Sequence, residues 1–300
     1  MKWIFGMLFV VALMAIGYYF FVKPSEFEVN LKAKTIPGDL IGTIRIWNRS
    51  LDSARIVQVD SFNSLKQTII LGDRNYKYDW NFVTVNDSLT EVNIQITQPG
   101  RMLLNKLLIP FTNQDIEKDA KDIVSGFYEI LKEHLRITRV ELIGEVELDS
   151  SFCVCRSLET SQIEKANGMM KDYPLLTSFI ANFNLKTAGP PIVKIGTWRH
   201  NLGELKFDFC FPIIEQDSLP VIDSLFYRKF KKKKVLKAEY YGNYITSDRA
   251  WYALLYYAEK NGYKVDSFPI EYFHNNPNLG MRESEWKAEV FLPLKDEHNE

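Results

Sequence analysis

The chain has 300 residues, of which 46% are hydrophobic and 14% aromatic, and its formal net charge is −1 at pH 7. That length predicts two domains with ample material for their cores, and the aromatic content favours β-rich structure over disorder. A net charge so close to zero gives no global field that would attract a polyanion, so we expect no nucleic-acid partner.

The N-terminal residues 3–22 include no charged side chain. About twenty apolar residues suffice, at about 1.5 Å each, to cross a hydrocarbon core of roughly 30 Å. A cleaved signal peptide is the alternative, but the apolar run continues past the small residues Ala15 and Gly17. The pattern therefore predicts an uncleaved transmembrane anchor over residues 1–23 and a single-pass membrane protein whose soluble part is exported to the periplasmic side.

Residues 24–138 are predicted to form a domain of antiparallel strands followed by one long helix. The first strand alternates apolar and polar side chains over residues 27–35, and a helix with acidic first turns and one apolar face extends to Arg136. Between them, turn residues separate strand-like segments at 54–60, 66–71, 75–85 and 90–97.

This order of elements, with the anchor before it and the Lys77-Tyr-Asp-Trp80 segment within it, resembles the START/polyketide-cyclase (SRPBCC) superfamily. The resemblance implies a helix-grip fold, in which a curved antiparallel sheet wraps the long C-terminal helix around a hydrophobic cavity. A small α+β domain with a filled core is the alternative.

The C-terminal half contains an internal repeat. Lys206-Phe-Asp-Phe-Cys-Phe-Pro-Ile213 aligns without a gap on Lys287-Ala-Glu-Val-Phe-Leu-Pro-Leu294, which places Asp208 on Glu289. A strand, a helix and another strand precede each copy. We therefore predict a duplicated βαββ domain over residues 139–296, with repeats at about 139–215 and 233–296.

The first repeat is predicted to begin with one strand over residues 138–155 and to continue with a helix from Asp172, with Pro174 in its first turn. We expect Cys153 and Cys155 to be buried thiols on one face of that strand. Tetrahedral zinc would need two further ligands, and the four histidines show no ligand spacing, so we expect neither a metal site nor a cofactor.

Three segments carry a second resemblance: Ala238-Glu-Tyr-Tyr-Gly-Asn-Tyr244, Pro269-Ile-Glu-Tyr-Phe-His-Asn-Asn-Pro277 and Trp286-Lys-Ala-Glu-Val-Phe-Leu-Pro293. Together they resemble the GyrI-like (gyrase-inhibitor-like) effector-binding domain, which is also appended to AraC-type regulators. The resemblance implies two pseudo-symmetric βαββ units with a ligand cleft between them, lined by aromatic side chains and a glutamate.

Carried over by position, that glutamate is Glu289, and Asp208 is its equivalent in the first repeat. A surface carboxylate paired with Lys237 or Lys287 is the alternative for Glu289, and Tyr244 could equally cap a helix or fill the core. The expected ligand-binding residues are Glu289, Tyr244, Asp208, Phe291, Phe273 and Tyr241.

We expect an α+β protein that binds a small lipophilic or cationic molecule in this cleft while anchored to the membrane, and that is not an enzyme. One alternative is a hydrolase in which the cleft glutamate, with a pKa raised by apolar surroundings, acts as general acid or base. The sequence shows no nucleophile–base pair and no phosphate-binding loop to support it. Another alternative is a structural or interaction module of the cell envelope with vestigial pockets.

Overall fold

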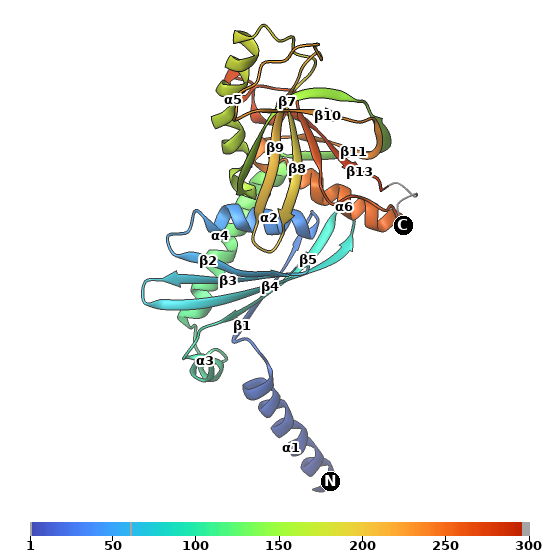
Figure 1. The fold of residues 1–300 in the computed structure, drawn as a ribbon. Coiled ribbons are helices and arrows are strands. Elements are labelled where there is room, and N and C mark those ends of the chain that lie inside the picture. The colour runs from blue at the N-terminus through green and yellow to red at the C-terminus, as the bar shows by residue number, and fades with distance from the viewer. Residues whose placement is uncertain (1, 61, 296–300) are drawn as a thin grey trace. The chain divides into compact units, whose positions relative to one another are not determined.

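The computed structural model describes residues 2–60 and 62–295, which divide into two compact units, residues 1–132 and 133–300 (Figure 1). Each unit contains one antiparallel sheet with helices packed on it. The predicted α+β class is therefore confirmed.

The N-terminal helix is shorter than the sequence predicts. Helix α1 (Lys2–Gly17) has 16 residues, which at about 1.5 Å each span about 24 Å, less than a hydrocarbon core of roughly 30 Å. The chain continues as a π-helical turn, η1 (Tyr18–Val22), in which the Tyr19 hydroxyl donates to the backbone oxygen of Lys106 at 3.0 Å.

No helix in the described ranges is long and apolar enough to cross a membrane. The predicted transmembrane anchor, and the single-pass membrane localisation with an exported soluble part that it implied, are therefore wrong.

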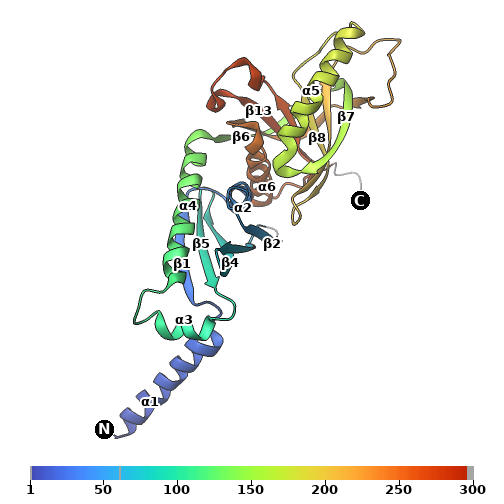
Figure 2. The same cartoon turned by 90° about the vertical axis from the view of Figure 1, so that its left-hand side faces the viewer.

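The first unit is a five-stranded sheet in the order β1-β5-β4-β3-β2. Alternation along β4 buries Tyr76, Tyr78 and Trp80 on one face. On that face the Trp80 ring meets Trp47 of α2 and Phe127 of α4, with centroids 6.2 and 5.1 Å away, so aromatic rings occupy the space beneath α4. Figure 2 shows α4 lying alongside this sheet. The elements are β1 (Phe27–Ala33), α2 (Pro37–Asn48), β2 (Ala54–Asp60), β3 (Ser64–Leu71), β4 (Arg74–Asn86), β5 (Leu89–Thr97), α3 (Met102–Leu108) and α4 (Asp115–Ile137).

The second unit is an eight-stranded sheet in the order β10-β7-β9-β8-β12-β13-β11-β6. Two βαββ repeats, β7-α5-β8-β9 and β11-α6-β12-β13, meet where β8 pairs with β12. The elements are β6 (Arg139–Leu148), β7 (Ser151–Ser161), α5 (Lys165–Asn182), β8 (Ile192–Arg199), β9 (Glu204–Pro212), β10 (Phe226–Phe230), β11 (Lys233–Tyr241), η3 (Tyr244–Thr246), α6 (Arg249–Asn261), β12 (Ile270–Phe273) and β13 (Lys287–Pro293).

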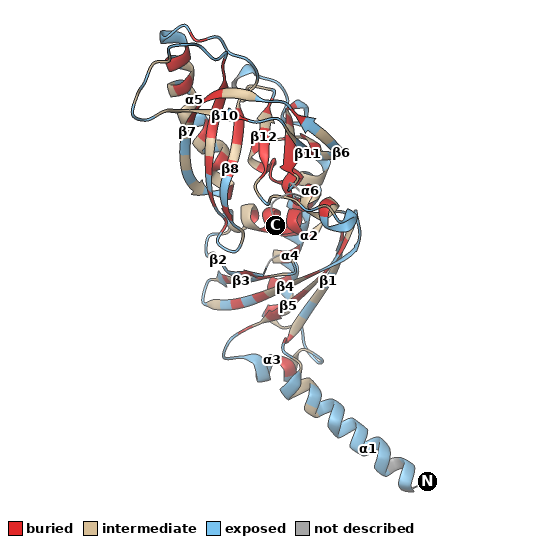
Figure 3. Ribbon diagram, turned by 45° about the vertical axis from the view of Figure 1, so that its right-hand side comes forward, coloured by how far each residue is buried: buried red, intermediate tan, exposed pale blue. Residues whose placement is uncertain are grey.

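This sheet must curl strongly. The two-residue link between β6 and β7 joins strands that are six positions apart in the sheet order. In a flat sheet that separation would be roughly 29 Å, whereas two linking residues reach only about 10 Å. The curled inner face holds a core to which all eight strands contribute, and β12, in the middle of the sheet, is buried along most of its length (Figure 3). Its buried members are Leu148, Cys153, Cys155, Ile192, Cys210, Phe230, Val235, Ile270 and Phe291.

Both helices lie on the opposite, outer face of the sheet. The second half of α5 buries Leu176 and Phe179, and α6 buries Trp251 and Leu254. Helix α6 ends where Gly262 adopts the left-handed conformation with φ 73°.

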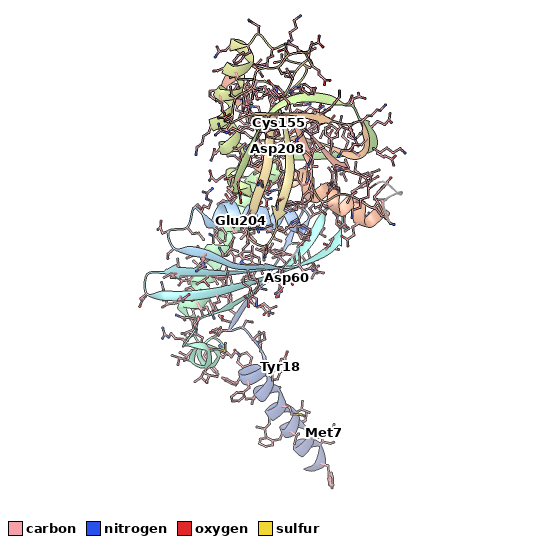
Figure 4. The ribbon with its side chains drawn as sticks, viewed as in Figure 1. Met7, Tyr18, Asp60, Cys155, Glu204 and Asp208 are labelled. Carbon is pink, nitrogen blue, oxygen red and sulfur yellow. A yellow bond between two sulfur atoms is a disulfide. The ribbon has the colours of Figure 1, made fainter. Side chains whose placement is uncertain are left out.

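The cysteines differ from the prediction of free thiols. Cys153 and Cys155 do share the inner face of β7, but Cys155 forms a disulfide with Cys210, its direct partner on β9. Cys153 remains a buried thiol. Figure 4 shows Cys155 close to Asp208, which lies two residues before Cys210 on the same neighbouring strand.

Two other predicted elements are wrong in extent. Residues 138–155, predicted as one strand, belong to two strands, β6 and β7. The chain turns at residues 149–150, and the two strands lie near opposite ends of the strand order. Helix α5 begins at Lys165 rather than at Asp172, so that Pro174 lies inside the helix. The earlier start matters for function, because those first residues form one wall of a cavity.

Candidate functional site

A cavity of about 360 Å³ lies in the second unit, between the first half of α5 and the segments that flank the ends of β8, β11, β12 and β13. Its walls come from both repeats. The lining residues are Ala166, Asn167, Met169, Met170, Tyr173, Pro190, Pro191, Phe209, Asn243, Tyr244, Ile245, Phe273, His274, Asn275, Asn276, Pro277 and Trp286.

One wall depends on how closely α5 approaches the sheet. A Cβ atom at Gly168 would lie only 3.2 Å from the side chain of Leu158 on β7, so a residue without a side chain allows this contact. The close contact orients Met169, Met170 and Tyr173 along the cavity. Methionine side chains adapt readily to the shape of a bound molecule.

The facing wall is a cluster of three aromatic rings. The ring of Tyr244 is 4.7 Å from that of Phe273 and 5.4 Å from that of Trp286, measured between centroids. The Tyr244 hydroxyl accepts a hydrogen bond from the backbone N–H of Asn275 at 3.0 Å and donates to the backbone oxygen of Lys287 at 2.9 Å. Burial raises the pKa of Tyr244 to about 12, so this phenol stays neutral.

Much of the polar capacity around the cavity is already used. The Asn243 side-chain oxygen accepts from the backbone N–H of Ile245 at 2.9 Å, and that of Asn275 accepts from the N–H of Lys287 at 2.7 Å. The described lining includes no Asp, Glu, Lys or Arg. Nor does the described part of the chain contain a group of three or more His, Cys, Asp or Glu that could hold a metal ion.

The six predicted ligand-binding residues lie on two different faces of the sheet. Alternation explains the division: Tyr272 pairs directly with Glu289 and shares its face, so the next residue, Phe273, lies on the other. Tyr244 and Phe273 line the cavity, whereas the inner face carries Glu289, Asp208, Phe291 and Tyr241.

Glu289 is held in an ion-pair network on that inner face. Its carboxylate lies 2.7 Å from Lys237 Nζ, 3.1 Å from His274 Nε2 and 3.6 Å from Lys287 Nζ. Burial opposes ionisation, but the hydrogen bond and charge of Lys237, together with His274, outweigh it and hold the pKa of Glu289 below its ordinary value. The raised pKa that a general acid would need is not present.

Asp208 and Tyr241 are also engaged with protein partners. Arg228 lies 2.6 Å from the Asp208 carboxylate, and Ser157 Oγ donates to it at 2.6 Å. The Tyr241 hydroxyl donates to Glu239 at 2.8 Å. The remaining member of the predicted set, Phe291, is 5% exposed and belongs to the inner core.

Several cavity residues were missed from the sequence. His274 and Trp286 lie inside the segments that carry the GyrI-like resemblance, so that resemblance could have identified them as cavity residues. Met169 and Met170 precede Pro174 in a stretch that was not predicted to be helical, and no local pattern placed them opposite the aromatic cluster.

Comparison with known proteins identifies the region that contains this cavity. Residues 165–295 match the family described as a GyrI-like small molecule binding domain, which confirms the GyrI-like resemblance for that region. No match was found among curated proteins. These comparisons do not support the resemblance of the first unit to the SRPBCC superfamily.

Solved structures show distant similarity. The C-terminal domain of EcmrR is 13% identical, with a TM-score of 0.45 over 53% of this chain and 98% of that one. SAV2435 bound to tetraphenylphosphonium is 14% identical, with a TM-score of 0.38 over 52% and 94%. A hydrolase from Listeria innocua is 9% identical, with a TM-score of 0.35 over 55% and 98%. At these low values, function has to be argued from the cavity itself.

Proposed function

We propose that the second unit binds a small lipophilic molecule in the cavity between α5 and the Tyr244–Phe273–Trp286 cluster, and that it does so without catalysis. The observation that carries this proposal is a cavity lined mainly by aromatic and apolar side chains, inside the region that matches a small-molecule-binding family.

The dimensions and chemistry of the cavity suit such a ligand. Sites for small molecules typically measure about 300–1,000 Å³ and are lined mainly by hydrophobic and aromatic groups. Rings of Tyr173, Tyr244, Phe273 and Trp286 offer flat contact surfaces from both walls. The few polar groups around them, such as the amide of Asn243, would orient the ligand rather than bind it strongly.

A hydrolase is less well supported by this geometry. The glutamate proposed for that chemistry, Glu289, lies on the opposite face of the sheet from the cavity and is ionised by its partners. The cavity itself offers Tyr173, Tyr244 and His274 as titratable groups, and the Tyr244 hydroxyl is already hydrogen-bonded to backbone atoms. Binding is therefore the function that these contacts favour.

Filling the cavity tests the proposal. Ala166 lies on the lining face of α5, and Ala166→Trp would place an indole in the cavity without deleting a core side chain. The matched control is Ala181→Trp, on the exposed side of the same helix and outside the lining. With Nile red as a neutral fluorescent probe, we expect binding to weaken by about tenfold or more in the first variant and by less than about twofold in the control.

The two outcomes differ clearly. Loss of affinity in Ala166→Trp alone would locate binding in this cavity. Equal affinity of both variants and the unsubstituted protein would show that the dye binds elsewhere, and no saturable binding by the unsubstituted protein would contradict the proposed function.

A further inference from the structure

Two glutamates lie on the strands next to the cavity, and each is paired with a lysine. Glu271 on β12 is completely buried and forms an ion pair with Lys165, which is also buried. Lys165 Nζ donates to Ser247 Oγ at 2.8 Å and lies 4.5 Å from the centroid of the Trp251 ring. Ser247 Oγ in turn donates to Glu271 at 2.6 Å. The charges of Lys165 and Glu271 therefore cancel inside the protein.

This buried group lies directly beneath the cavity. Lys165 precedes Ala166, which lines the cavity, and Lys165 Nζ is 5.7 Å from the centroid of Phe273, another lining residue. Ser247 Oγ lies 3.0 Å from the backbone oxygen of Tyr244 in the facing wall. The Lys165–Glu271 pair thus lies next to an aromatic ring of the lining, and it offers no net negative charge to a ligand.

The second glutamate lies on the inner face of the sheet, where it contacts a histidine of the cavity lining. His274 lines the cavity, and its Nε2 lies 3.1 Å from the Glu289 carboxylate. Lys237 binds Glu289 at 2.7 Å, while Lys287 binds the neighbouring Glu239 at 2.8 Å. The two lysines and two glutamates of this network sum to zero charge, so Glu289 is also neutralised.

An organic cation entering such a cavity would lose hydration, and the described lining contains no carboxylate to compensate for that loss. The attraction of aromatic faces for a cation is smaller than the loss of solvation for an unpaired ion. Two of the four asparagines in the described lining, Asn243 and Asn275, already accept a backbone hydrogen bond at their amide oxygens. An uncharged molecule of the same shape would make the same ring contacts without that loss of hydration.

We propose that this domain selects uncharged lipophilic ligands over cations of the same shape, and that Lys165 and Lys237 set this selectivity by neutralising Glu271 and Glu289. The inference rests on the proposed binding function and adds its ligand class. Of the two lysines, Lys237 is the better one to substitute, because its side chain is 19% exposed. Replacing Lys165 would leave Glu271 as an unpaired buried acid, so a change in ligand selectivity could not be told apart from a loss of folding.

The experiment compares two probes of nearly equal shape on the full chain: triphenylphosphine oxide, which is neutral, and methyltriphenylphosphonium, which is a cation. By calorimetry we expect the unsubstituted protein to bind the oxide about tenfold more tightly or better. Lys237→Met should narrow that ratio by about threefold or more, through tighter binding of the cation, because Glu289 loses its main partner. Lys237→Met combined with Glu289→Gln should restore the original ratio.

Lys232→Met is the matched control. Lys232 lies in the turn between β10 and β11 and forms an exposed ion pair with Glu147, so its substitution removes an equal charge. A change in ratio as large as that of Lys237→Met would overturn the role of Lys237. Equal binding of both probes by the unsubstituted protein, or a preference for the cation, would overturn the selectivity while leaving the binding function in place. The comparison of the two probes on the unsubstituted protein does not depend on the folding of any variant. Binding of neither probe would overturn the proposed function and this inference with it.

Discussion

At the scale of single residues, the ion pairs of Glu289 determine how it responds to pH. Its folded pKa is below the ordinary value of 4.5 because Lys237 and His274 outweigh the effect of burial. A carboxyl group whose pKa is lowered by folding stabilises the folded state above the unfolded pKa, and this stabilisation is lost as pH falls through the folded pKa. Removing the charge should therefore matter at neutral pH and not in acid.

We expect Glu289→Gln to lower the denaturation midpoint of the protein at about pH 7, and the difference from the unsubstituted protein to shrink as the pH falls below the ordinary carboxyl pKa of 4.5. Urea titrations at several pH values measure this. Glu215→Gln is the control, since Glu215 and its partner Lys229 are both more than half exposed, and it should change the midpoint little at any pH. A Glu289→Gln effect that stays constant, or grows, as pH falls would contradict the assignment.

At the scale of elements, the βαββ order and the faces of the strands could be predicted, because alternation and an internal repeat are local signals. The start of α5 could not be predicted in this way. Pro174 suggested a helix beginning just before it, yet inside the helix it removes only one hydrogen bond, the one to the carbonyl of Met170. The cavity depends on that missed segment, which is why Tyr244 and Phe273 were found and the opposite wall was not. The split between β6 and β7 depends on pairing with distant strands, which no local pattern records.

The turn between β11 and η3 gives a prediction at the same scale. Gly242 has φ 143°, and a Cβ atom there would lie 2.6 Å from the Tyr240 hydroxyl oxygen and 2.9 Å from Thr138 Cγ2. Its N–H donates to the backbone oxygen of Trp286 at 3.1 Å, so a shift would reach the aromatic cluster. We expect Gly242→Ala to lower the free energy of unfolding by about 1–3 kcal/mol and to weaken probe binding.

Gly126→Ala is the control of opposite sign. Gly126 lies within α4, and a Cβ atom there would meet nothing within 4 Å, so alanine should stabilise the helix by about 0.5–1 kcal/mol. Chemical denaturation measures the change in unfolding free energy for both substitutions. Equal effects of the two substitutions would contradict the special role of the turn at Gly242.

At the scale of the whole molecule, the cavity belongs to one unit. Its lining runs from Ala166 to Trp286, and the Lys165–Glu271 and Lys237–Glu289 pairs lie within the same unit, residues 133–300. A compact unit with its own core can fold alone. We therefore expect a fragment of residues 133–300 to bind triphenylphosphine oxide with an affinity within about twofold of the full chain, because no lining residue is removed.

Calorimetry on the fragment measures this affinity, and circular dichroism checks that the fragment is folded. Ala166→Trp made in the fragment should weaken binding by about tenfold or more, as in the full chain, which ties the signal to the cavity. A folded fragment that no longer binds would show that the first unit contributes to the site. A fragment that binds as the full chain does would show that α5 and the two repeats alone build the binding site.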